Sequence, residues 1–232
     1  MAYKASSSNS GVSNTPSTSV PAGLAAGDEV VLVASIDNAS ALFNPEDLPI
    51  NFAELNEVAL TLDGQTVWLG WKRLSGADSG SYTFGDVGVT AGWSCAAFAF
   101  SGRHPTDPPV SSTPNTSNAA NTSPVTITAN GATASQGDDL IWISAPDINT
   151  SQAGDGHTPP TDFMERQDVE DGFFTVLSGA TRDNVSAGAT GNISGTLTLT
   201  SGASGWAAFL IRLPAAPSAG GGGYYAMLEE MS

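Results

Sequence analysis

The sequence contains few of the residues on which disulfide, metal and catalytic sites depend. Among its 232 residues there are one cysteine and two histidines. A single cysteine can form neither a disulfide within the chain nor a thiolate zinc site. Cys95 lies in the apolar segment 93–100, where a small buried hydrophobe is expected. We therefore expect a fold held together by apolar packing, with no cofactor.

Basic residues are also scarce. Seven lysines and arginines stand against 23 acidic residues, which gives a net charge of −16. Only Lys72 and Arg73 are adjacent in the sequence. A protein that neutralises a run of phosphates needs a stripe of such side chains. The composition therefore argues against nucleic acid and anionic membranes as partners, and the acidity is typical of a soluble, self-repelling surface.

Long hydrophobic segments are absent as well. No stretch approaches the ~20 apolar residues that cross a bilayer, which predicts no membrane insertion. The first residues, Met-Ala-Tyr-Lys followed by Ser and Asn, contain no apolar core of a secretory signal. We expect synthesis in a cytoplasm and, for any location outside it, another route.

The sequence does contain an internal repeat. Four motifs occur twice in the same order: Gly-Asp with an apolar run, Pro-x-x-Phe-x-Glu, a short alternating segment after Gly, and Trp followed by Ala-Ala-Phe. The first copies span 27–34, 49–54, 80–84 and 93–98, and the second copies span 137–144, 160–165, 195–199 and 206–209. The spacing of about 110 residues is far longer than a solenoid or propeller repeat. The pattern predicts a duplicated sheet unit that repeats its packing and turns.

Short strands separated by turn residues are indicated through both copies. Alternating apolar residues over 58–71 flank Asp63-Gly64, which is a strong hairpin signal. Continuous apolar runs such as 30–36 and 140–145 predict buried strands. No amphipathic helix longer than a turn or two is visible. We expect an all-β protein, an antiparallel β-sandwich that is jelly-roll-like and built from two sequence-related halves.

The arrangement of the halves is open at this stage. They could share one sandwich or stand apart, and we favour a single pseudo-symmetric sandwich because each half has few strands to cover both faces of a core. The expected segments are an N-terminal arm or edge strand (1–20), a first β half (21–103), a linker (104–122), a second β half (123–213), a Gly/Pro-rich linker (214–223) and a C-terminal docking peptide (224–232).

The C-terminal segment differs in composition from the rest. Residues 220–223 are four consecutive glycines, and an apolar-aromatic peptide follows them. A flexible spacer before such a peptide is typical of a docking tag. The partner-docking residues would be Tyr224, Tyr225, Met227, Leu228 and Met231. The alternative is a frayed terminus without a role.

Catalytic signatures are missing. His104 and His157 both lie beside prolines in expected loops, and there is no Gly-x-Ser-x-Gly elbow. Glu54 and Glu165 occupy equivalent repeat positions and could suggest a carboxylate pair. Each follows a Pro-x-x-Phe turn, where an acid more simply faces solvent. We assign no catalytic residue and expect a protein that is not an enzyme.

An oxygen-rich loop in the second half resembles a calcium-binding loop. Asp147, Asn149, Ser151 and Asp155 alternate there, but Gln152 stands where a calcium loop of the EF-hand type needs glycine. We expect no metal, with Asp147, Asn149 and Asp155 as the candidate ligands should one bind.

One tryptophan could form a sugar-binding platform. Trp68 and Trp71 lie on opposite faces of one expected strand, so at most one of them should be in a core. Trp71, with Lys72 and Arg73 beside it, is the better candidate for stacking on a glycan ring. An edge or interface tryptophan explains the same pattern.

The repeated motifs, together with Ser101-Gly102-Arg103 after the first Ala-Ala-Phe strand, resemble a group of accessory virion proteins of tailed bacteriophages and prophages. The resemblance covers about residues 20–214. It implies a two-half β-sandwich on the virion surface, at the tail tip or fibres or decorating the capsid, assembled in the cytoplasm of the bacterial host. The implied partners are other virion subunits and further copies of the chain. The family offers no catalytic residues to transfer.

Three hypotheses follow for function. The first is a structural virion module, a compact knob anchored through its termini. The second is a carbohydrate-binding adhesin that contacts host surface glycans through loops 37–50 and 147–162 or the Trp71 platform. The third, which the sequence favours least, is an enzyme acting on polysaccharide.

Overall fold

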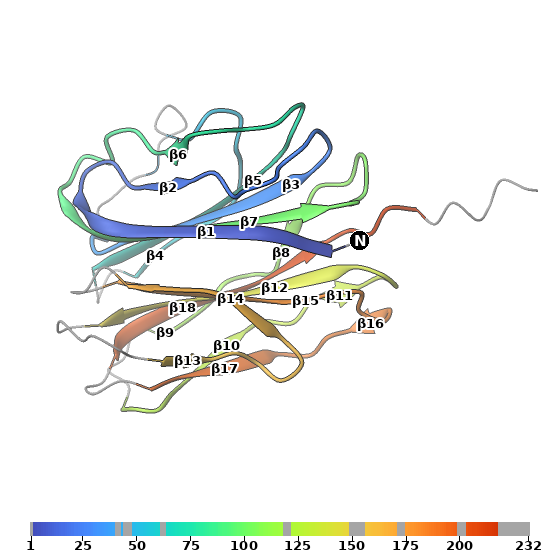
Figure 1. The fold of residues 1–232 in the computed structure, drawn as a ribbon. Helices are drawn as coiled ribbons and strands as arrows, with labels where there is room; N and C mark the ends of the chain where they lie inside the picture. Colours follow the sequence, from blue (N-terminus) through green and yellow to red (C-terminus); the bar gives the residue numbers. More distant parts are fainter. Residues whose placement is uncertain are drawn as a thin grey trace, which may run out of the picture.

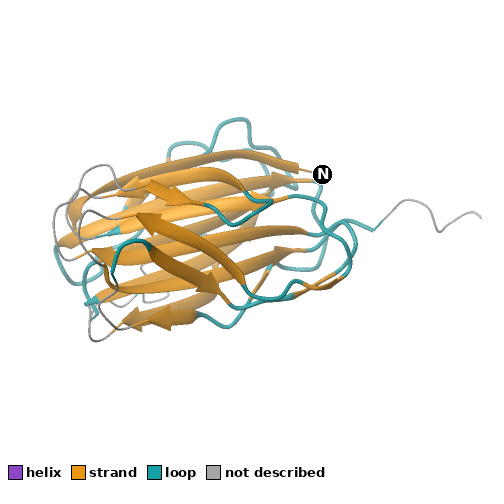
Figure 2. Ribbon diagram, turned by 90° about the horizontal axis from the view of Figure 1, so that it is seen from below, coloured by secondary structure: helices purple, strands orange, loops and turns teal. Residues whose placement is uncertain are grey.

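The computed structural model describes residues 2–39, 43, 48–60, 64–117, 122–148, 156–170, 175–198 and 203–217, and within these ranges all regular elements are β-strands (Figure 2). The strands before residue 104 are β1 (Ala2–Ser13), β2 (Ser17–Ser19), β3 (Glu29–Ile36), β4 (Ala53–Leu60), β5 (Gln65–Arg73), β6 (Ser81–Thr83) and β7 (Ala91–Ser101). The later strands are β8 (Val110–Ser111), β9 (Asn115–Ser117), β10 (Val125–Ala129), β11 (Thr133–Ala134), β12 (Asp139–Ile148), β13 (Gly156–Thr158), β14 (Met164–Glu170), β15 (Val176–Arg182), β16 (Gly188–Ala189), β17 (Ile193–Thr198) and β18 (Ala203–Leu213). The strands pair antiparallel in several sheets, so the expected all-β, sandwich-like class is confirmed.

The two large sheets have the same strand order. The first sheet runs β1-β7-β3-β5-β4, and the second, written in the matching direction, runs β8-β18-β12-β15-β14. Strand β9 also pairs with β18, so β8 and β9 together occupy the place that β1 has in the first sheet. Smaller sheets, β2-β6, β10-β17-β13 and β11-β16, accompany them. Each strand of the first large sheet thus has a positional counterpart in the second.

The sheets are stacked in layers with three apolar cores between them (Figure 1). The first core, with Trp68, lies between the β2-β6 layer and the first large sheet. The middle core, with Phe98 and Phe209, lies between the two large sheets. The third, with Trp142, lies between the second large sheet and β10-β17-β13. The expected single sandwich was therefore wrong in part, because the halves share the middle core and each also encloses a core of its own.

Strand β3 contributes to two of these cores. All of its residues are buried. Val30 and Leu32 belong to the first core, whereas Val31 and Val33 belong to the middle core, as the two-residue period of a strand requires. Burial of both faces explains why the segment is a continuous apolar run and not an alternating one.

The repeated turn motifs adopt matching backbone conformations. Asn51 and Asp162, each inside a Pro-x-x-Phe turn, have φ of 66° and 67°, a left-handed conformation that Asn and Asp tolerate better than most residues. In both turns the Phe amide donates to the Pro carbonyl, at 3.1 and 3.0 Å. A β-bulge follows each turn, in β4 and in β14. These residues therefore repeat because they build the same turn twice.

The N-terminal segment and the linker are parts of the sheets. Strand β1 pairs along the whole of β7, from Ala2 opposite Ser101 to Ser13 opposite Ala91. Residues 2–13 are thus an edge strand, one of the two forms expected for this region. The expected linker 104–122 contributes β8 and β9 to the second large sheet.

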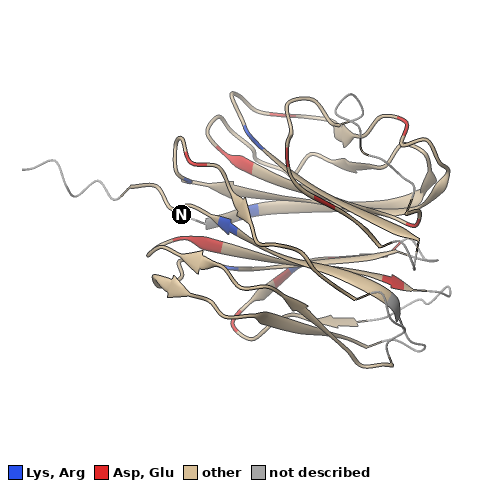
Figure 3. Cartoon of the chain, turned by 180° about the vertical axis from the view of Figure 1, so that it is seen from behind, with Lys and Arg blue, Asp and Glu red and all other residues tan. Residues whose placement is uncertain are grey.

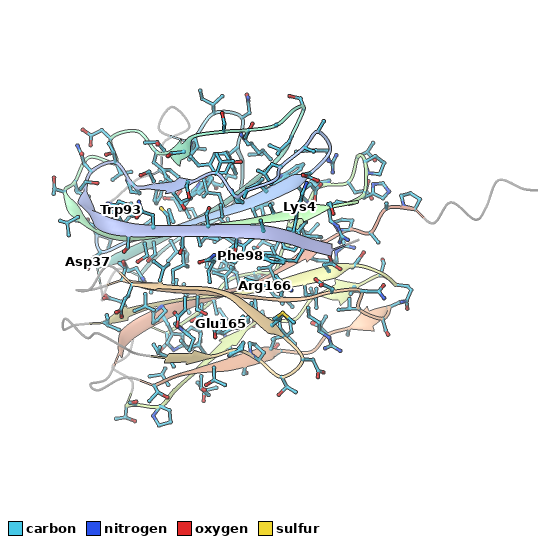
Figure 4. All side chains as sticks on the ribbon, in the orientation of Figure 1. Lys4, Asp37, Trp93, Phe98, Glu165 and Arg166 are labelled. Atoms are coloured by element: carbon cyan, nitrogen blue, oxygen red, sulfur yellow. The ribbon has the colours of Figure 1, made fainter. Side chains whose placement is uncertain are left out.

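Both ends of the described chain leave the stack at the same side. Ala2 pairs with Ser101, and Arg103 forms a bridge with Ala215. Lys4 lies near this end in Figure 4, and Asp37 lies near the opposite end, where its amide donates to Gly92 O at 2.9 Å. Turns such as 37–39 and 88–92 are therefore separated from the chain ends by the length of the sheets.

Specific polar contacts join the two halves around the middle core. At the β1–β14 side, the Arg166 guanidinium stacks on the Tyr3 ring at 3.8 Å. Gln167 Nε2 donates to Ser6 Oγ at 2.6 Å. Elsewhere, Ser94 Oγ and Thr175 Oγ1 share a hydrogen bond of 2.9 Å. These contacts fix the register of the large sheets across the apolar layer.

Candidate functional site

An open pocket lies on the outer layer of the first half. Its cavity volume is about 510 Å³, and its walls come from the turn at 49–51, from Lys72 on β5, and from residues 77–79 and 81–83, which include β6. Because Lys72 pairs opposite Val30 at the start of β3, the pocket lies toward the end where the chain termini leave. We call it the Lys72 pocket.

Lys72 is held in place by two aromatic rings and a carboxylate. Its Nζ lies 5.0 Å from the centroid of the Phe52 ring and 4.7 Å from that of Tyr82, which are cation–π distances. The ammonium also forms an ion pair with Asp78. Only 12% of the Lys72 side chain is exposed, against 28% for Asp78. The protein therefore neutralises and orients the Lys72 ammonium, which remains partly exposed to the pocket.

Tyr82 contributes a buried hydroxyl. Its exposed fraction is 4%, and its hydroxyl makes no hydrogen bond of normal geometry within the described part of the chain. Burial, then the negative charge of Asp78 and a hydrogen-bonding contact with its carboxylate, raise the pKa of Tyr82 well above its usual value. The group therefore stays protonated and faces the Asp78 carboxylate at the base of the pocket.

The structure separates the three residues of the expected sugar platform. Trp71 points to the other face of β5 and packs, half-buried, against the middle core. The Arg73 guanidinium lies 5.6 Å from the Trp71 ring, forms an ion pair with Glu29 and donates to His104 O at 2.6 Å. Lys72 alone reaches the pocket. The three residues therefore do not form one exposed platform.

The prediction for the Trp68–Trp71 strand is confirmed. The two tryptophans lie on opposite faces, and only Trp68 is a buried member of a core. Trp71 is partly buried and packs against the edge of the middle core, a contact that no period along one strand reveals.

The second half contains a chain of hydrogen bonds that the sequence did not reveal. Ser144 Oγ and His157 Nε2 are 3.0 Å apart, and His157 Nδ1 lies 3.1 Å from Asp168 Oδ1. The three residues come from β12, β13 and β14, so the contacts join the second large sheet to the small β10-β17-β13 sheet. Ser, His and Asp in this order are the groups of a hydrolase triad.

Substrate access determines whether these three residues can act as a catalytic triad. A catalytic serine must contact its substrate, but Ser144 is fully buried and none of the His157 side chain is exposed. The ring of Trp142 lies 6.3 Å from the His157 ring and closes that side. Only Asp168, with 26% of its side chain exposed, touches solvent. We interpret the chain as a buried polar connection between sheets.

A sequence signal for this cluster did exist. Ser144 stands where the first copy of the repeat has Ala34, and Asp168 follows the repeated Pro-x-x-Phe-x-Glu motif. A hydroxyl within a fully buried apolar strand needs a partner. The partner itself, His157, could not be identified, because it lies on β13, a strand of three residues that is too short to show a regular pattern.

Other residues singled out by the sequence are not brought together. Glu54 lies on β4 and Glu165 on β14. Strand β14 packs against β1, which is at the opposite edge of the first sheet from β4, so the two glutamates do not form a pair. Glu54 instead accepts a hydrogen bond from Trp68 Nε1 at 3.3 Å.

The remaining candidates are placed as follows. Asp147 is buried on β12, whereas Asn149 and Asp155 lie outside the described residues. No group of three or more His, Cys, Asp or Glu in the described ranges is arranged to hold a metal ion. The expected docking residues Tyr224, Tyr225, Met227, Leu228 and Met231 also lie outside the described residues.

Acidic positions occur over both halves of the structure (Figure 3), and Lys72 and Arg73 are the only adjacent basic residues in the sequence. Within the described ranges, no helix has the length and apolar character needed to cross a membrane. Comparison of the chain with models of protein families gives no match, and comparison with curated proteins gives none either.

Proposed function

We propose that this chain is a non-enzymatic structural component of a tailed-phage virion. It would be a β-sandwich module displayed on the particle surface, at the tail tip or fibres or as capsid decoration, and anchored through its termini to other virion subunits. The phage assignment rests on the resemblance of the repeated motifs. The structural observation that carries the anchoring is that both ends of the described chain leave at one end of the stack.

The architecture suits a display module. Three apolar cores in series support a rigid body without a disulfide within the chain. Turns such as 88–92 lie at the end away from the termini, where an anchored module would present them. A net charge of −16 keeps neighbouring copies soluble before assembly. We expect several copies on each particle, assembled in the bacterial cytoplasm.

Deletion of 224–232 tests the anchoring directly. Particles of the phage or prophage that encodes the chain should incorporate the full chain and lose it when this peptide is removed. The matched control replaces glycines 220–223 by serines, which keeps the spacer flexible and should leave incorporation unchanged. Incorporation is measured by mass spectrometry of purified particles. Equal incorporation of the full chain and of the chain that lacks 224–232 would show that this peptide is not needed for docking.

A carbohydrate-binding adhesin is the second candidate, and the Lys72 pocket favours it. The pocket combines a fixed charge pair and small polar side chains on one concave surface, and these groups can donate and accept the hydrogen bonds of sugar hydroxyls. Binding of the labelled chain to intact host cells, and its loss after periodate oxidation of cell-surface glycans, would support this function. Binding that survives oxidation would exclude it.

A further inference from the structure

We propose that the Lys72 pocket binds one uncharged, hydroxyl-rich ring, a neutral hexose unit of a glycan. This inference deepens the adhesin candidate and does not depend on the chain being carried by a virion. It follows from the groups that line the pocket, from their charges, and from the different residues that the second half has at the equivalent positions.

The charge of the lining argues for a neutral ligand. Lys72 and Asp78 form an ion pair and cancel each other, and they are the charged residues among the lining side chains. The aromatic faces of Phe52 and Tyr82 are already occupied by the Lys72 ammonium, so a second cation has no place on them. An anion would meet the field of a chain whose net charge is −16.

The polar groups are those that bind vicinal hydroxyls. The Lys72 ammonium can donate, and the Asp78 carboxylate can accept. Ser79 and Ser81 add hydroxyls that do either. The Tyr82 hydroxyl is itself buried and faces the Asp78 carboxylate, so it helps to orient this acceptor toward a ligand.

The pocket also offers an apolar edge. Pro49 and Ile50 line one side, and Ile50 is 81% exposed. A hexose has an apolar ring face beside its hydroxyls, so the two kinds of surface match. A volume of about 510 Å³ lies within the range of small-molecule sites.

The equivalent place in the second half shows that the fold does not require this arrangement. Leu197 stands at the repeat position of Tyr82 and is fully buried. Arg182 stands at the position of Lys72 and pairs with Asp162 at 3.7 Å, with 42% of its side chain exposed. The same turn and strands thus exist without the buried hydroxyl and the enclosed cation, so these features of the first half are not explained by packing.

Titration of the isolated chain with neutral sugars, followed by two-dimensional ¹H–¹⁵N NMR, tests the proposal. Glucose, galactose, mannose and N-acetylglucosamine are added separately up to about 100 mM, because an open site with few hydrogen bonds should bind with Kd of the order of 1–10 mM. At least one sugar should shift the amides of Ser79, Ser81 and Thr83 in a saturable way. Absence of saturable shifts with all four sugars would overturn the proposal.

Two variants assign the binding to the pocket. Tyr82→Phe removes the hydroxyl that orients the Asp78 carboxylate, and Asp78→Ala removes that acceptor itself; each should weaken binding about tenfold, the loss expected for one hydrogen bond of this kind. Arg182→Ala, at the equivalent place in the second half, should bind as the unmodified chain does. Unchanged affinity in Tyr82→Phe and Asp78→Ala, or tighter binding of glucuronate than of every neutral sugar, would contradict the proposal. Particle incorporation is a separate measurement, so failure here leaves the virion proposal standing.

Discussion

Arg103 and Asp139 form a buried ion pair that links the two halves. Arg103 Nη1 lies 2.9 Å from Asp139 Oδ2, and the side chains are 0% and 1% exposed. Arg103 follows β7 of the first large sheet, and Asp139 begins β12 of the second. The pair therefore connects the sheets at the end of the stack where the chain termini leave.

Loss of either partner should destabilise the whole stack. Asp139→Asn leaves the Arg103 guanidinium buried without its ion-pair partner, and such a loss costs about 3–5 kcal/mol. We expect a decrease of this size in the free energy of unfolding, measured by urea denaturation. Arg182→Ala, which breaks the more exposed Arg182–Asp162 pair, should change it by less than about 1 kcal/mol. Similar effects of the two substitutions would contradict the role given to the buried pair.

Gly179→Ala should loosen the middle core. A Cβ at this position would lie 2.2 Å from Phe98 Cζ, so the opposing sheet would have to move, and overpacking of this kind costs about 1–3 kcal/mol. The control is Gly156→Ala, where nothing lies within 4 Å of the added atom. Thermal unfolding of both variants is the measurement. A Gly179→Ala chain as stable as the control would mean that the two large sheets do not pack as described.

The Ser144–His157–Asp168 chain should be structural and unreactive. Ser144→Ala removes the hydrogen-bond partner of the buried His157 Nε2. We therefore expect the free energy of unfolding to fall by about 1–3 kcal/mol. A fluorophosphonate probe, which modifies activated serines, should not label the folded chain. Labelling that disappears in Ser144→Ala would show an accessible nucleophile and overturn the non-enzymatic account.

Glu29 should make stability depend on pH in an identifiable way. Burial raises the pKa of Glu29 above its ordinary value of 4.5, and the Arg73 guanidinium opposes this shift without cancelling it. A carboxyl with a raised pKa in the folded state contributes stability that is complete below 4.5 and is lost as the pH rises through the folded pKa. Glutamine at this position is uncharged at every pH, so the stability of Glu29→Gln lacks this contribution to the pH dependence.

The difference in unfolding free energy between the unmodified chain and Glu29→Gln should therefore shift in favour of the unmodified chain as the pH falls toward 4.5. Urea denaturation of both chains at several pH values measures it, and the contributions of the other carboxyls cancel in the difference. A constant difference, or one that shifts the other way, would contradict the burial of this carboxyl.

Local patterns in the sequence predicted the elements that have many apolar residues. The two strands of the predicted hairpin, β4 and β5, do pair, with Leu60 opposite Gln65. The buried runs 30–36 and 140–145 are central strands. These elements could be predicted because their own residues, through period and turn chemistry, determine both type and register.

Other features depend on contacts between distant segments. Strands β8, β9 and β13 have two or three residues each, too few to show a period, and they exist because a longer neighbour offers hydrogen bonds. The packing of Trp71 against the middle core and the contact of Ser144 with His157 result from the stacking of layers. No spacing within one segment encodes such contacts, so the candidate pocket and the buried polar chain could be found only in the structure.

The most direct test of the proposed function is electron cryo-microscopy of the particle that carries the chain. We predict density for the stacked sheets on the particle surface, with the end that contains Ala2 and Ala215 toward a neighbouring subunit and the turns at 37–39 and 88–92 directed outward. Absence of the chain from purified particles, or its attachment through the turn end with the termini exposed, would contradict the account.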